Sequence, residues 1–483
     1  MKLIFEKSVP GRKGLTISHS DVPTSVNLKP KLLRSRPAAL PELSELDVVR
    51  HFTELSRRNF GVDTNFYPLG SCTMKYNPKV TERIAAYPGF AHLHPLLPQL
   101  RRGGILTQGA LQVLYETDLL LREITGMAAF TMQPMAGAHG ELTGIMMMAA
   151  YHHDRGNCKT IVLIADTAHG TNPASAAIAG YTVKAVPSDA TGGMDLAALK
   201  SMINDEVAGL MLTCPNTLGL FDPNIQAICE MIHSVDGLVY YDGANLNAIV
   251  GKVRPGDLGF DIVHLNLHKT FATPHGAGGP GSGPVGVVDK LVEFLPVSLV
   301  VKREDGTYAL EYHRPKSIGY IAPFYGNFGV ILKAYVYVLM LGRDGLIRVA
   351  ENAVLNANYV KDKLKDWYDL PYPQVCKHEC VLSATRQAEV GVRALDIAKG
   401  LIDMGFHPPT MYFPMTVKEA LMVEPTETES KESLDVFITA MIELAKKAKT
   451  DPDSLHAAPV TTPVGRLDET AAARNLNIAS LSD

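Results

Sequence analysis

Apolar runs of strand length alternate with helix-length segments between residues 160 and 290. The strand-like runs lie at 160–166, 181–187, 208–214, 237–244, 261–267 and 283–289. The segments between them, 171–180, 195–204 and 224–235, have the length and composition of helices. Strands that alternate with helices are typical of βαβ units, so we predict an α/β fold with a mostly parallel, doubly wound sheet. Sheets of this kind bind ligands beyond the carboxyl ends of their strands.

The segments on either side of this region have different patterns. Residues 1–104 are rich in proline and basic side chains and have little periodicity, which predicts an extended N-terminal arm and linker that lies on another surface. We place the large domain at 105–330, beginning with a predicted helix. Long helical segments and three strand-like stretches at 331–450 predict a smaller C-terminal α+β domain. The polar residues 451–483 are expected to form a C-terminal tail.

Composition narrows the class of protein. The 483 residues are 46% hydrophobic and 20% charged, as in globular proteins. A net charge of −4 argues against a nucleic-acid-binding protein, which usually carries a basic patch. The first residues have no apolar core of signal-peptide length, and the most apolar stretches are too short to span a bilayer. We therefore expect a cytoplasmic protein without a membrane contact, and its six cysteines do not suggest a disulfide framework.

Three short motifs match known sites poorly. The GxGxxG match at 281–286 precedes a strand-like run instead of a helix, so it does not predict a dinucleotide site. The triplet 268–270 resembles the end of a phosphate-binding loop but lacks the glycine before its lysine. His264 and His268 are four residues apart on a strand, too far for one metal ion. The cysteine-rich stretch 376–380 has no second ligand cluster, so we predict no metal site.

Four features that carry chemistry are expected at one rim of the predicted sheet. Asp242 ends one strand, and Lys269 follows the next strand. Gly137 and Gly140 precede a helix, where exposed backbone N–H groups form a cradle for an anion. His169 lies between a strand and a helix. Because the carboxyl ends of parallel strands meet at one edge, we expect these residues to lie together.

Pyridoxal 5′-phosphate is a cofactor that uses all four features. It needs a lysine for a Schiff base, a cradle for its phosphate and a carboxylate against its pyridinium nitrogen. A flat side chain such as His169 stacks on its ring, and His268 is placed to act on the phosphate or on the pKa of Lys269. Each residue alone has an ordinary structural explanation, but their order and spacing together favour the cofactor.

Several segments of the chain resemble the P-protein family of the glycine cleavage system, the pyridoxal-phosphate glycine dehydrogenase (decarboxylating). They are "PLGSCTMKYNP" (68–78), "AGAHGE" (136–141), "AHGTNPASA" (168–176), "YDGANLNA" (241–248), "NLHKTFATPHGAGGPGSGP" (266–284), "EPTETESK" (424–431) and "TPVGRLDETAAARN" (462–475). The resemblance covers nearly the whole chain. It is to the lysine-bearing half of the single-chain members, and so to subunit 2 of the two-subunit form.

The resemblance implies fold type I, the aminotransferase-like class, and a role for each candidate residue. Lys269 and His169 would be catalytic, with Lys269 as the Schiff-base lysine and His169 stacked on the ring. Asp242 would contact the ring nitrogen. The remaining cofactor contacts expected are Gly137, Ala138, His139, Asn245 and His268.

The resemblance also implies a reaction and its partners. Glycine would lose carbon dioxide, and its aminomethyl group would pass to the lipoyl arm of H-protein. A homologous subunit without the lysine would complete a heterotetramer, and Gly278 and Gly279 would reach across that interface. Ser71, Cys72 and Thr73 are expected at the mouth of the site. Two alternatives stay open: a hydroxymethyltransferase-like enzyme that acts on glycine or serine, and a non-catalytic scaffold subunit.

Overall fold

The computed structural model describes residues 2–22, 28–100, 103–276 and 281–476. The chain forms two compact units, Met1–Thr64 and Asn65–Asp483. The first unit contains α1 (Glu45–Ser56), and short 3-10 turns η1 (Phe5–Lys7) and η2 (Pro30–Leu32).

The prediction of an extended arm is wrong at α1. This helix begins at a capping box: the Asp47 N–H donates to Ser44 Oγ over 3.1 Å, and the Ser44 N–H donates to Asp47 Oδ2 over 3.2 Å. The reciprocal bonds give partners to donors that a helix start otherwise leaves free. The Ser-x-x-Asp spacing is a sequence signal for a helix start.

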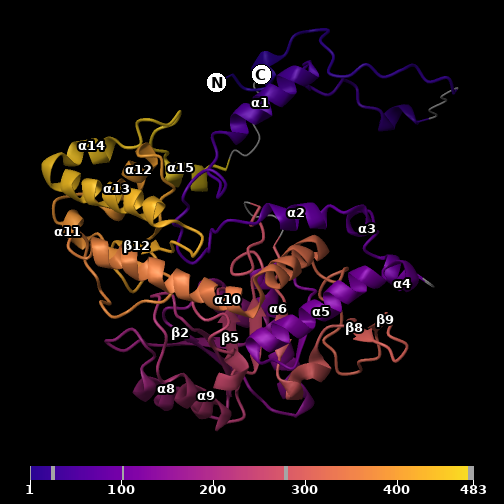
Figure 1. Ribbon diagram of the computed structural model, residues 1–483, viewed down its shortest axis with the longest axis vertical. Helices are drawn as coiled ribbons and strands as arrows, with labels where there is room; N and C mark the ends of the chain where they lie inside the picture. Colours follow the sequence, from indigo (N-terminus) through magenta and orange to yellow (C-terminus); the bar gives the residue numbers. More distant parts are fainter. Residues whose placement is uncertain (1, 23–27, 101–102, 277–280, 477–483) are drawn as a thin grey trace. The chain divides into compact units, whose positions relative to one another are not determined.

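A seven-stranded sheet lies at the centre of the second unit (Figure 1), in the order β1-β7-β6-β5-β4-β2-β3. The strands β3, β2, β4, β5 and β6 are parallel, β7 runs antiparallel to β6, and β1 runs antiparallel to β7. The prediction of a mostly parallel sheet is confirmed. The strand bounds are β1 (Ala129–Thr131), β2 (Ile161–Ala165), β3 (Thr182–Val186), β4 (Val207–Thr213), β5 (Leu238–Gly243), β6 (Ile262–Leu265) and β7 (Val285–Val287).

Helices connect the strands and cover both faces of the sheet. The longest, α10, has a break at Gly342, which has a left-handed φ of 60°. The larger helices around the sheet are α5 (Gln108–Thr125), α6 (Gly137–Asp154), α7 (Thr171–Ile178), α8 (Leu196–Met202), α9 (Ile225–His233) and α10 (Phe328–Leu364). The shorter ones are α2 (Lys79–Ala85), α3 (Pro88–Ala91), α4 (Gly103–Leu106), η3 (Leu97–Gln99), η4 (Pro255–Leu258) and η5 (Asp289–Phe294).

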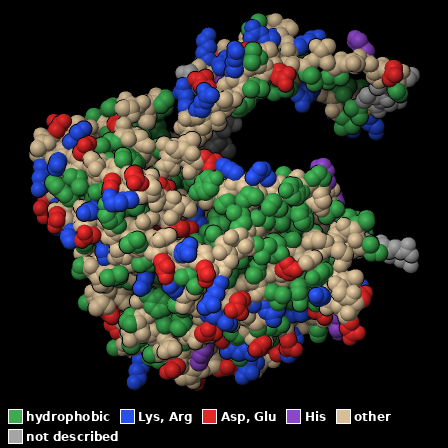
Figure 2. Space-filling model, in the orientation of Figure 1, with side chains coloured by type: hydrophobic (Ala, Val, Ile, Leu, Met, Phe, Trp, Pro, Cys, Tyr) green, Lys and Arg blue, Asp and Glu red, His purple; other side chains and the backbone are tan. Residues whose placement is uncertain are grey.

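Hydrophobic side chains gather on one face of the second unit, around α2 and the N-terminal half of α10 (Figure 2). On α10 the side chains of Leu339 and Met340 are exposed, and Tyr87, just after α2, is exposed as well. A contiguous apolar patch on a surface is typical of an interaction site. Within the described ranges we find no helix with the length and hydropathy needed to cross a membrane.

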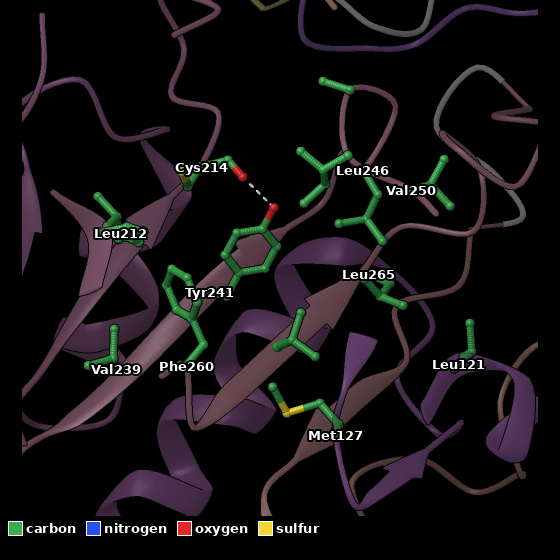
Figure 3. Close-up of a cluster of buried hydrophobic side chains, with 14 of the residues drawn as sticks. Leu121, Met127, Leu212, Cys214, Val239, Tyr241, Leu246, Val250, Phe260 and Leu265 are labelled. Carbon is green, nitrogen blue, oxygen red and sulfur yellow. Dashed lines mark hydrogen bonds between the residues drawn. The ribbon is translucent and has the colours of Figure 1, made fainter. Parts of the chain in front are cut away.

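Alternate residues of each strand face opposite sides of the sheet and fill two different cores. Val239 and Tyr241 of β5 pack in a core with side chains of α5, α9 and α10. Figure 3 shows part of this core, where the Tyr241 hydroxyl donates to the Cys214 carbonyl. Leu238 and Tyr240 face the other side, where they pack with α6 and α7. Burial on both faces explains why these strands read as continuous apolar runs.

The C-terminal part of the chain forms an α+β region, as predicted. Its antiparallel sheet has the order β10-β12-β11, and Phe437 of α13 lies in its core. Val330 of α10 packs in the large core, whereas Leu364 of the same helix packs in the C-terminal core, so α10 belongs to both. The boundaries predicted near 104, 330 and 450 stay predictions. The elements are β10 (Cys380–Ser383), α11 (Thr385–Ala388), α12 (Ala394–Asp403), β11 (Thr410–Met411), β12 (Ala420–Val423), α13 (Lys431–Thr450), α14 (Pro452–Ala457) and α15 (Glu469–Arg474), and a separate hairpin is formed by β8 (Leu299–Lys302) and β9 (Tyr308–Glu311).

We predict that Gly144→Ala destabilises the protein although alanine favours helices. A Cβ at this position of α6 would overlap the Tyr240 ring and lie 3.1 Å from Ile262 Cγ2. Overpacking of this kind costs about 1–3 kcal/mol. Urea unfolding measures the loss. The matched control is Gly329→Ala on α10, where a Cβ meets nothing within 4 Å among the described atoms; equal destabilisation by both variants would contradict the close packing of α6.

Candidate active site

A cavity of about 250 Å³ lies at the carboxyl ends of the parallel strands. Most of the residues predicted for the site line it, and they come from loops and helix starts far apart in sequence. These predicted residues are Ser71, Gly137, Ala138, His169, Asp242, Asn245, His268 and Lys269. His139, Cys72 and Thr73 are not among the lining residues.

Lys269 lies in the turn that follows β6 and is half-buried. Its Nζ donates a hydrogen bond to the Ser71 carbonyl over 2.7 Å. Among the described residues that line the cavity, it is the one lysine or arginine. Its amine is therefore the one amino group that the described lining of the cavity offers.

Asp242 lies near the end of β5 with 4% of its surface exposed. Its Oδ1 accepts from the Ala244 N–H over 3.1 Å and lies 3.4 Å from Nε2 of His264. The other ring nitrogen of His264 lies 2.7 Å from the Tyr240 hydroxyl. Burial lowers the pKa of His264, although Asp242 opposes that shift. A buried carboxylate supported by neutral groups is thus directed at the cavity.

Glu141 is a further site residue, which the sequence analysis did not single out. It lies on α6, is 5% exposed and lines the cavity. Burial, with the nearby Asp242 carboxylate, raises its pKa to about 8, so the carboxyl group is mostly protonated at pH 7. Its Oε1 lies 2.7 Å from the Thr171 hydroxyl. The sequence holds a signal for it, because positions 137 and 141 are four apart and share one helix face.

The start of α6 forms a cradle with unused donors. Its N-cap, Ala136, offers no side-chain acceptor to the first N–H groups of the helix. A Cβ on Gly137 would lie 2.5 Å from Asn266 Oδ1, so a larger residue here would displace the Asn266 amide. Asn266 Oδ1 and Ser282 Oγ are buried and have no hydrogen-bond partner among the described residues. Buried polar atoms without partners are rare in proteins and suggest that a polar ligand completes the site.

Two neutral histidines lie next to Lys269. Burial, with smaller contributions from His275 and Lys269, lowers the pKa of His268 to about 3. Burial and Lys269 lower the pKa of His275 to about 4. The two rings meet edge to face with centroids 5.0 Å apart, and the Ser282 N–H donates to His268 Nδ1 over 3.4 Å. Both rings are uncharged at pH 7.

His169 follows β2, just before α7, and its ring is exposed at the cavity. Its Nδ1 lies 2.9 Å from Oγ1 of Thr171. Desolvation by the surrounding protein lowers its pKa, Lys269 adds to that shift and Asp242 opposes it. His139, a predicted cofactor contact, is not among the lining residues, and its Nδ1 accepts from the Met135 N–H over 3.2 Å.

Hydrogen bonds to two buried carboxyl groups, those of Glu379 and Glu424, hold the segment 68–76 in place. The Ser71 N–H donates to Glu379 Oε2 over 2.8 Å. Glu424 accepts from the Thr73 N–H over 2.8 Å, from Thr73 Oγ1 over 2.7 Å and from Asn245 Nδ2 over 2.8 Å. Ser71 and Thr73 both have positive φ angles, 66° and 51°. These bonds hold the strained turn so that the Ser71 carbonyl meets Lys269.

Of the three residues predicted at the mouth, Ser71 lines the cavity and Thr73 is buried behind it. Burial raises the pKa of Cys72, although Lys269 opposes the shift, so this residue is a thiol at pH 7. The residues that support the segment, Glu379 and Glu424, lie more than 300 positions away in sequence. The sequence gives no local signal for them.

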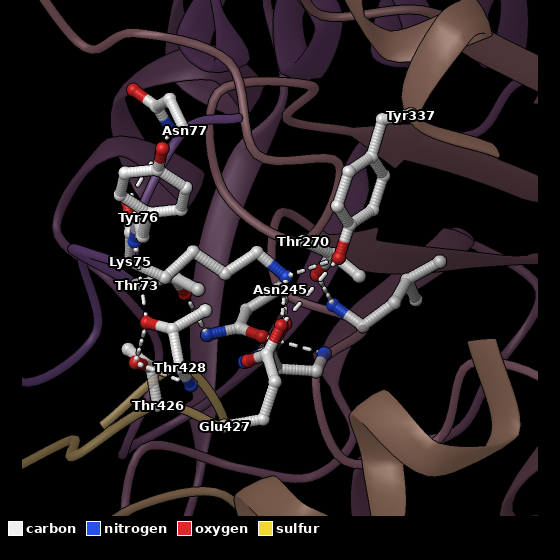
Figure 4. A network of polar contacts seen from close by, with 12 residues as sticks. Thr73, Lys75, Tyr76, Asn77, Asn245, Thr270, Tyr337, Thr426, Glu427 and Thr428 are labelled. Atoms are coloured by element: carbon white, nitrogen blue, oxygen red, sulfur yellow. Dashed lines mark hydrogen bonds and ion pairs between the residues drawn. The ribbon is translucent and has the colours of Figure 1, made fainter. Parts of the chain in front are cut away.

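Lys75 is buried with 2% of its surface exposed, at the end of the same segment (Figure 4). Its Nζ contacts Glu427 Oε1 at 2.6 Å, the Tyr337 hydroxyl at 3.2 Å and Asn247 Oδ1 at 3.3 Å. Burial alone would lower the pKa of Lys75, but Glu427 and Tyr337 outweigh it and the net shift is upward. This ion pair joins the segment to α10 and to the loop after β12.

Two trios of side chains in this region have ligating atoms within 4.8 Å of one another. They are Glu141, Asp242 and His264, and His378, Glu379 and Glu424. Hydrogen bonds from hydroxyl, amide and backbone donors already engage their carboxylates. Burial and Glu424 raise the pKa of Glu379 well above its usual range. We therefore describe both trios as polar networks that carry protons, and assign no metal to them.

Similarity to solved structures identifies the class of fold. A glycine decarboxylase (P-protein) of the glycine cleavage system, in inhibitor-bound form, superimposes with a TM-score of 0.69 and 22% identity, covering 86% of this chain and 93% of that one. Lactobacillus brevis glutamate decarboxylase gives a TM-score of 0.66 at 12% identity, with 86% and 95% covered. At these identities the likeness shows the fold alone. The architecture is fold type I, as predicted.

Sequence similarity identifies the family. The model described as "Glycine cleavage system P-protein" matches residues 13–313, and "Glycine dehydrogenase, C-terminal domain" matches 349–458. A Listeria monocytogenes serotype 4b protein named "Probable glycine dehydrogenase (decarboxylating) subunit 2" is 56% identical over 478 residues, 98% of this chain and 97% of its own length. A protein of the same name from Caldanaerobacter subterraneus subsp. tengcongensis is 56% identical over 477 residues, with the same coverage. The chain belongs to the glycine cleavage system P-protein family.

We predict that Glu427→Ala lowers the free energy of unfolding by about 3–5 kcal/mol, because it leaves the Lys75 ammonium buried without its counter-ion. Urea unfolding followed by circular dichroism measures the change. Asp362→Ala serves as the control: it breaks an exposed pair with Lys365, and solvent-exposed pairs contribute little to stability. Similar small losses for both variants would show that the buried pair does not support the segment.

Proposed function

We propose that this chain is the lysine-bearing subunit of a pyridoxal-phosphate enzyme that decarboxylates glycine and transfers the aminomethyl group to the lipoyl arm of H-protein. The observation that carries the proposal is the convergence of Lys269 and Asp242 with an open anion cradle in one cavity. Family membership and a fold type I architecture support it.

The residues around the cavity fit the cofactor. Lys269 would attach to it, and Asp242 would lie against its ring nitrogen. The N–H groups at the start of α6 and the unpartnered hydroxyl of Ser282 would hold its phosphate. His169 would stack on its ring, and Asn245, held by Thr73 and Glu424, would contact its rim. The bound cofactor supplies an electron sink for the electrons that leave the carboxyl bond of glycine.

The protein's own groups hold the charges of this reaction. Asp242, buried and kept in place by the Ala244 N–H, would favour the protonated form of the ring nitrogen of a bound cofactor. The Ser71 carbonyl accepts a hydrogen bond from Lys269 Nζ and so orients the amine. Among the described lining residues there is no guanidinium to pair with a substrate carboxylate. A carboxylate without a fixed cationic partner loses less stabilisation when it leaves as neutral carbon dioxide.

The proposed assembly contains a second, homologous subunit without the lysine. The name "subunit 2" of the relatives and the apolar face around α2 and α10 (Figure 2) support it. We propose a heterotetramer that takes a lipoyl H-protein as its partner. The glycines expected to cross the interface, Gly278 and Gly279, lie outside the described residues. The cytoplasmic location stays a prediction.

The two alternative functions have less support. A hydroxymethyltransferase-like enzyme is not expected to carry the segment 68–78, which here forms one wall of the site. A non-catalytic scaffold has no need of a lysine and an aspartate in the same cavity. Release of labelled carbon dioxide from glycine, without a requirement for tetrahydrofolate, separates the first alternative from our proposal.

The test of the function is exchange of labelled bicarbonate into the carboxyl group of glycine. We predict exchange when the chain is combined with pyridoxal phosphate, the homologous subunit and lipoyl H-protein. The chain alone is expected to be a poor catalyst. Without the partner subunit its apolar face would be uncovered and its phosphate pocket would lack the partner's residues. Full exchange by the isolated chain would contradict the two-subunit proposal, and absence of exchange in the full mixture would contradict the function.

Two variants serve as controls in the same assay. Lys269→Arg keeps the positive charge but cannot form a Schiff base at neutral pH, so exchange should vanish while folding survives. Asp242→Asn should retain the cofactor but slow exchange by about two orders of magnitude or more, because an unprotonated ring is a poorer electron sink. Near wild-type exchange by either variant would overturn the role assigned to that residue.

A further inference from the structure

A chain of hydrogen bonds links Glu141 on α6 to His169 through Thr171. Thr171 Oγ1 lies 2.7 Å from Glu141 Oε1 and 2.9 Å from His169 Nδ1. The second oxygen of Glu141 lies 3.4 Å from Ser175 Oγ. The proposed function gives His169 a stacking role and leaves Glu141 and Thr171 without one.

The Thr171 hydroxyl has a single proton, so the series of hydrogen bonds from Glu141 to His169 can run in only one direction at a time. If the hydroxyl donates to Glu141, it must accept from a protonated Nδ1 of His169. If Glu141 carries a proton and donates to the hydroxyl, the hydroxyl donates to Nδ1 instead. The backbone N–H of Thr171 also points at Nδ1 over 3.3 Å, which requires a lone pair there. The backbone therefore selects the second direction, in which the ring proton is on Nε2.

The surroundings of Glu141 favour its protonated form. Asp242 faces it from β5, and its carboxylate adds to the effect of burial. Lys269 opposes the shift from the turn after β6, as do the hydroxyls of Thr171 and Ser175 on α7. Tyr240 of β5 and His264 of β6 also lie near Glu141, and both are neutral at pH 7, because burial raises the pKa of Tyr240 and lowers that of His264. The pKa of about 8 puts the change of direction within reach of an ordinary titration.

We propose that Glu141 is a positioning residue that acts through Thr171 to keep the proton of His169 on Nε2, where it donates to the carboxylate of the substrate. This inference rests on the proposed function. Nε2 of His169 has no hydrogen-bond partner among the described residues, and the ring lines the cavity. His169 then binds the carboxylate as a neutral donor, in a cavity whose described lining offers no guanidinium.

The direction of these hydrogen bonds makes the position of the His169 ring proton depend on pH. Below pH 8 Glu141 is protonated and Nε2 carries the ring proton. Above pH 8 the Glu141 carboxylate accepts the Thr171 proton, Nδ1 loses one of its two donors, and the Nδ1-protonated form gains population. His169 itself stays neutral over this range, because its pKa lies below the ordinary value of 6.5.

Nitrogen-15 NMR of the chain labelled at histidine tests the proposal without cofactor or glycine, because the two ring nitrogens have different shifts when protonated. His169→Asn identifies the signals. We predict an Nε2-protonated ring at pH 7 and a change in the tautomer ratio with a midpoint near pH 8. Glu141→Gln should remove that change, because the glutamine amide donates to the Thr171 hydroxyl at every pH. Its carbonyl oxygen can still accept the hydrogen bond from Ser175. An Nδ1-protonated ring at pH 7, or the same titration in Glu141→Gln, would overturn the proposal.

Kinetics of the assembled enzyme provide the second measurement. Thr171→Val breaks the chain and should raise the KM for glycine about tenfold with a smaller change in kcat, the loss expected for one hydrogen bond to a charged group. Thr171→Ser keeps the hydroxyl and should restore the KM. An unchanged KM in Thr171→Val would contradict the role of His169 in carboxylate binding. If the wild type lacks exchange, the proposed function fails, and the NMR result still decides the tautomer.

Discussion

The hydrogen bonds to the buried carboxylate of Glu424 are the constraint on which the site depends. They join the loop after β12 to Thr73 in the segment 68–76 and to Asn245 after β5. A buried carboxylate is costly unless donors surround it, so these segments are stable only when they meet. Once they meet, the turn at Ser71 directs its carbonyl at Lys269. The position of the Lys269 amine is thus set by the C-terminal part of the chain as well as by the sheet.

The described lining of the cavity contains three carboxyl groups, Glu141, Asp242 and Glu379, and the protein limits their repulsion by keeping protons on some of them. Burial raises the pKa of both Glu141 and Glu379, and in each case a neighbouring carboxylate adds to the shift. The histidines next to Lys269 are kept neutral for the same physical reason, burial, acting on the opposite charge. Few permanent charges therefore face the substrate, which suits a reaction in which a carboxylate becomes a neutral gas.

The parts of the site that the sequence predicts are those governed by local rules. Asp242 and Lys269 follow apolar runs, and parallel strands bring their carboxyl ends to one edge, so their convergence could be expected. Glu141 could have been predicted from the sequence, because it lies one helical turn beyond Gly137. Glu379, Glu424 and the Lys75–Glu427 pair were not, since each depends on contacts between segments hundreds of residues apart.

The same distinction explains the fold. The strands β2, β4 and β5 have five to seven residues, are buried on both faces and are easily predicted, whereas β1 has three residues and lies at the end of the sheet beside β7. A strand so short has no recognisable sequence pattern. Its place in the sheet is set by pairing with β7, which lies more than 150 residues later in the chain. The helix α1 was missed for another reason: its capping box outweighs a composition that otherwise indicates an extended arm.

The central claim, that Lys269 binds the cofactor covalently, is tested most directly by trapping. The chain is incubated with pyridoxal phosphate, reduced with borohydride, digested and mapped by mass spectrometry. The account predicts a pyridoxyl group on the peptide that contains Lys269. A pyridoxyl group found mainly on another lysine, or spread evenly over exposed lysines, would contradict it.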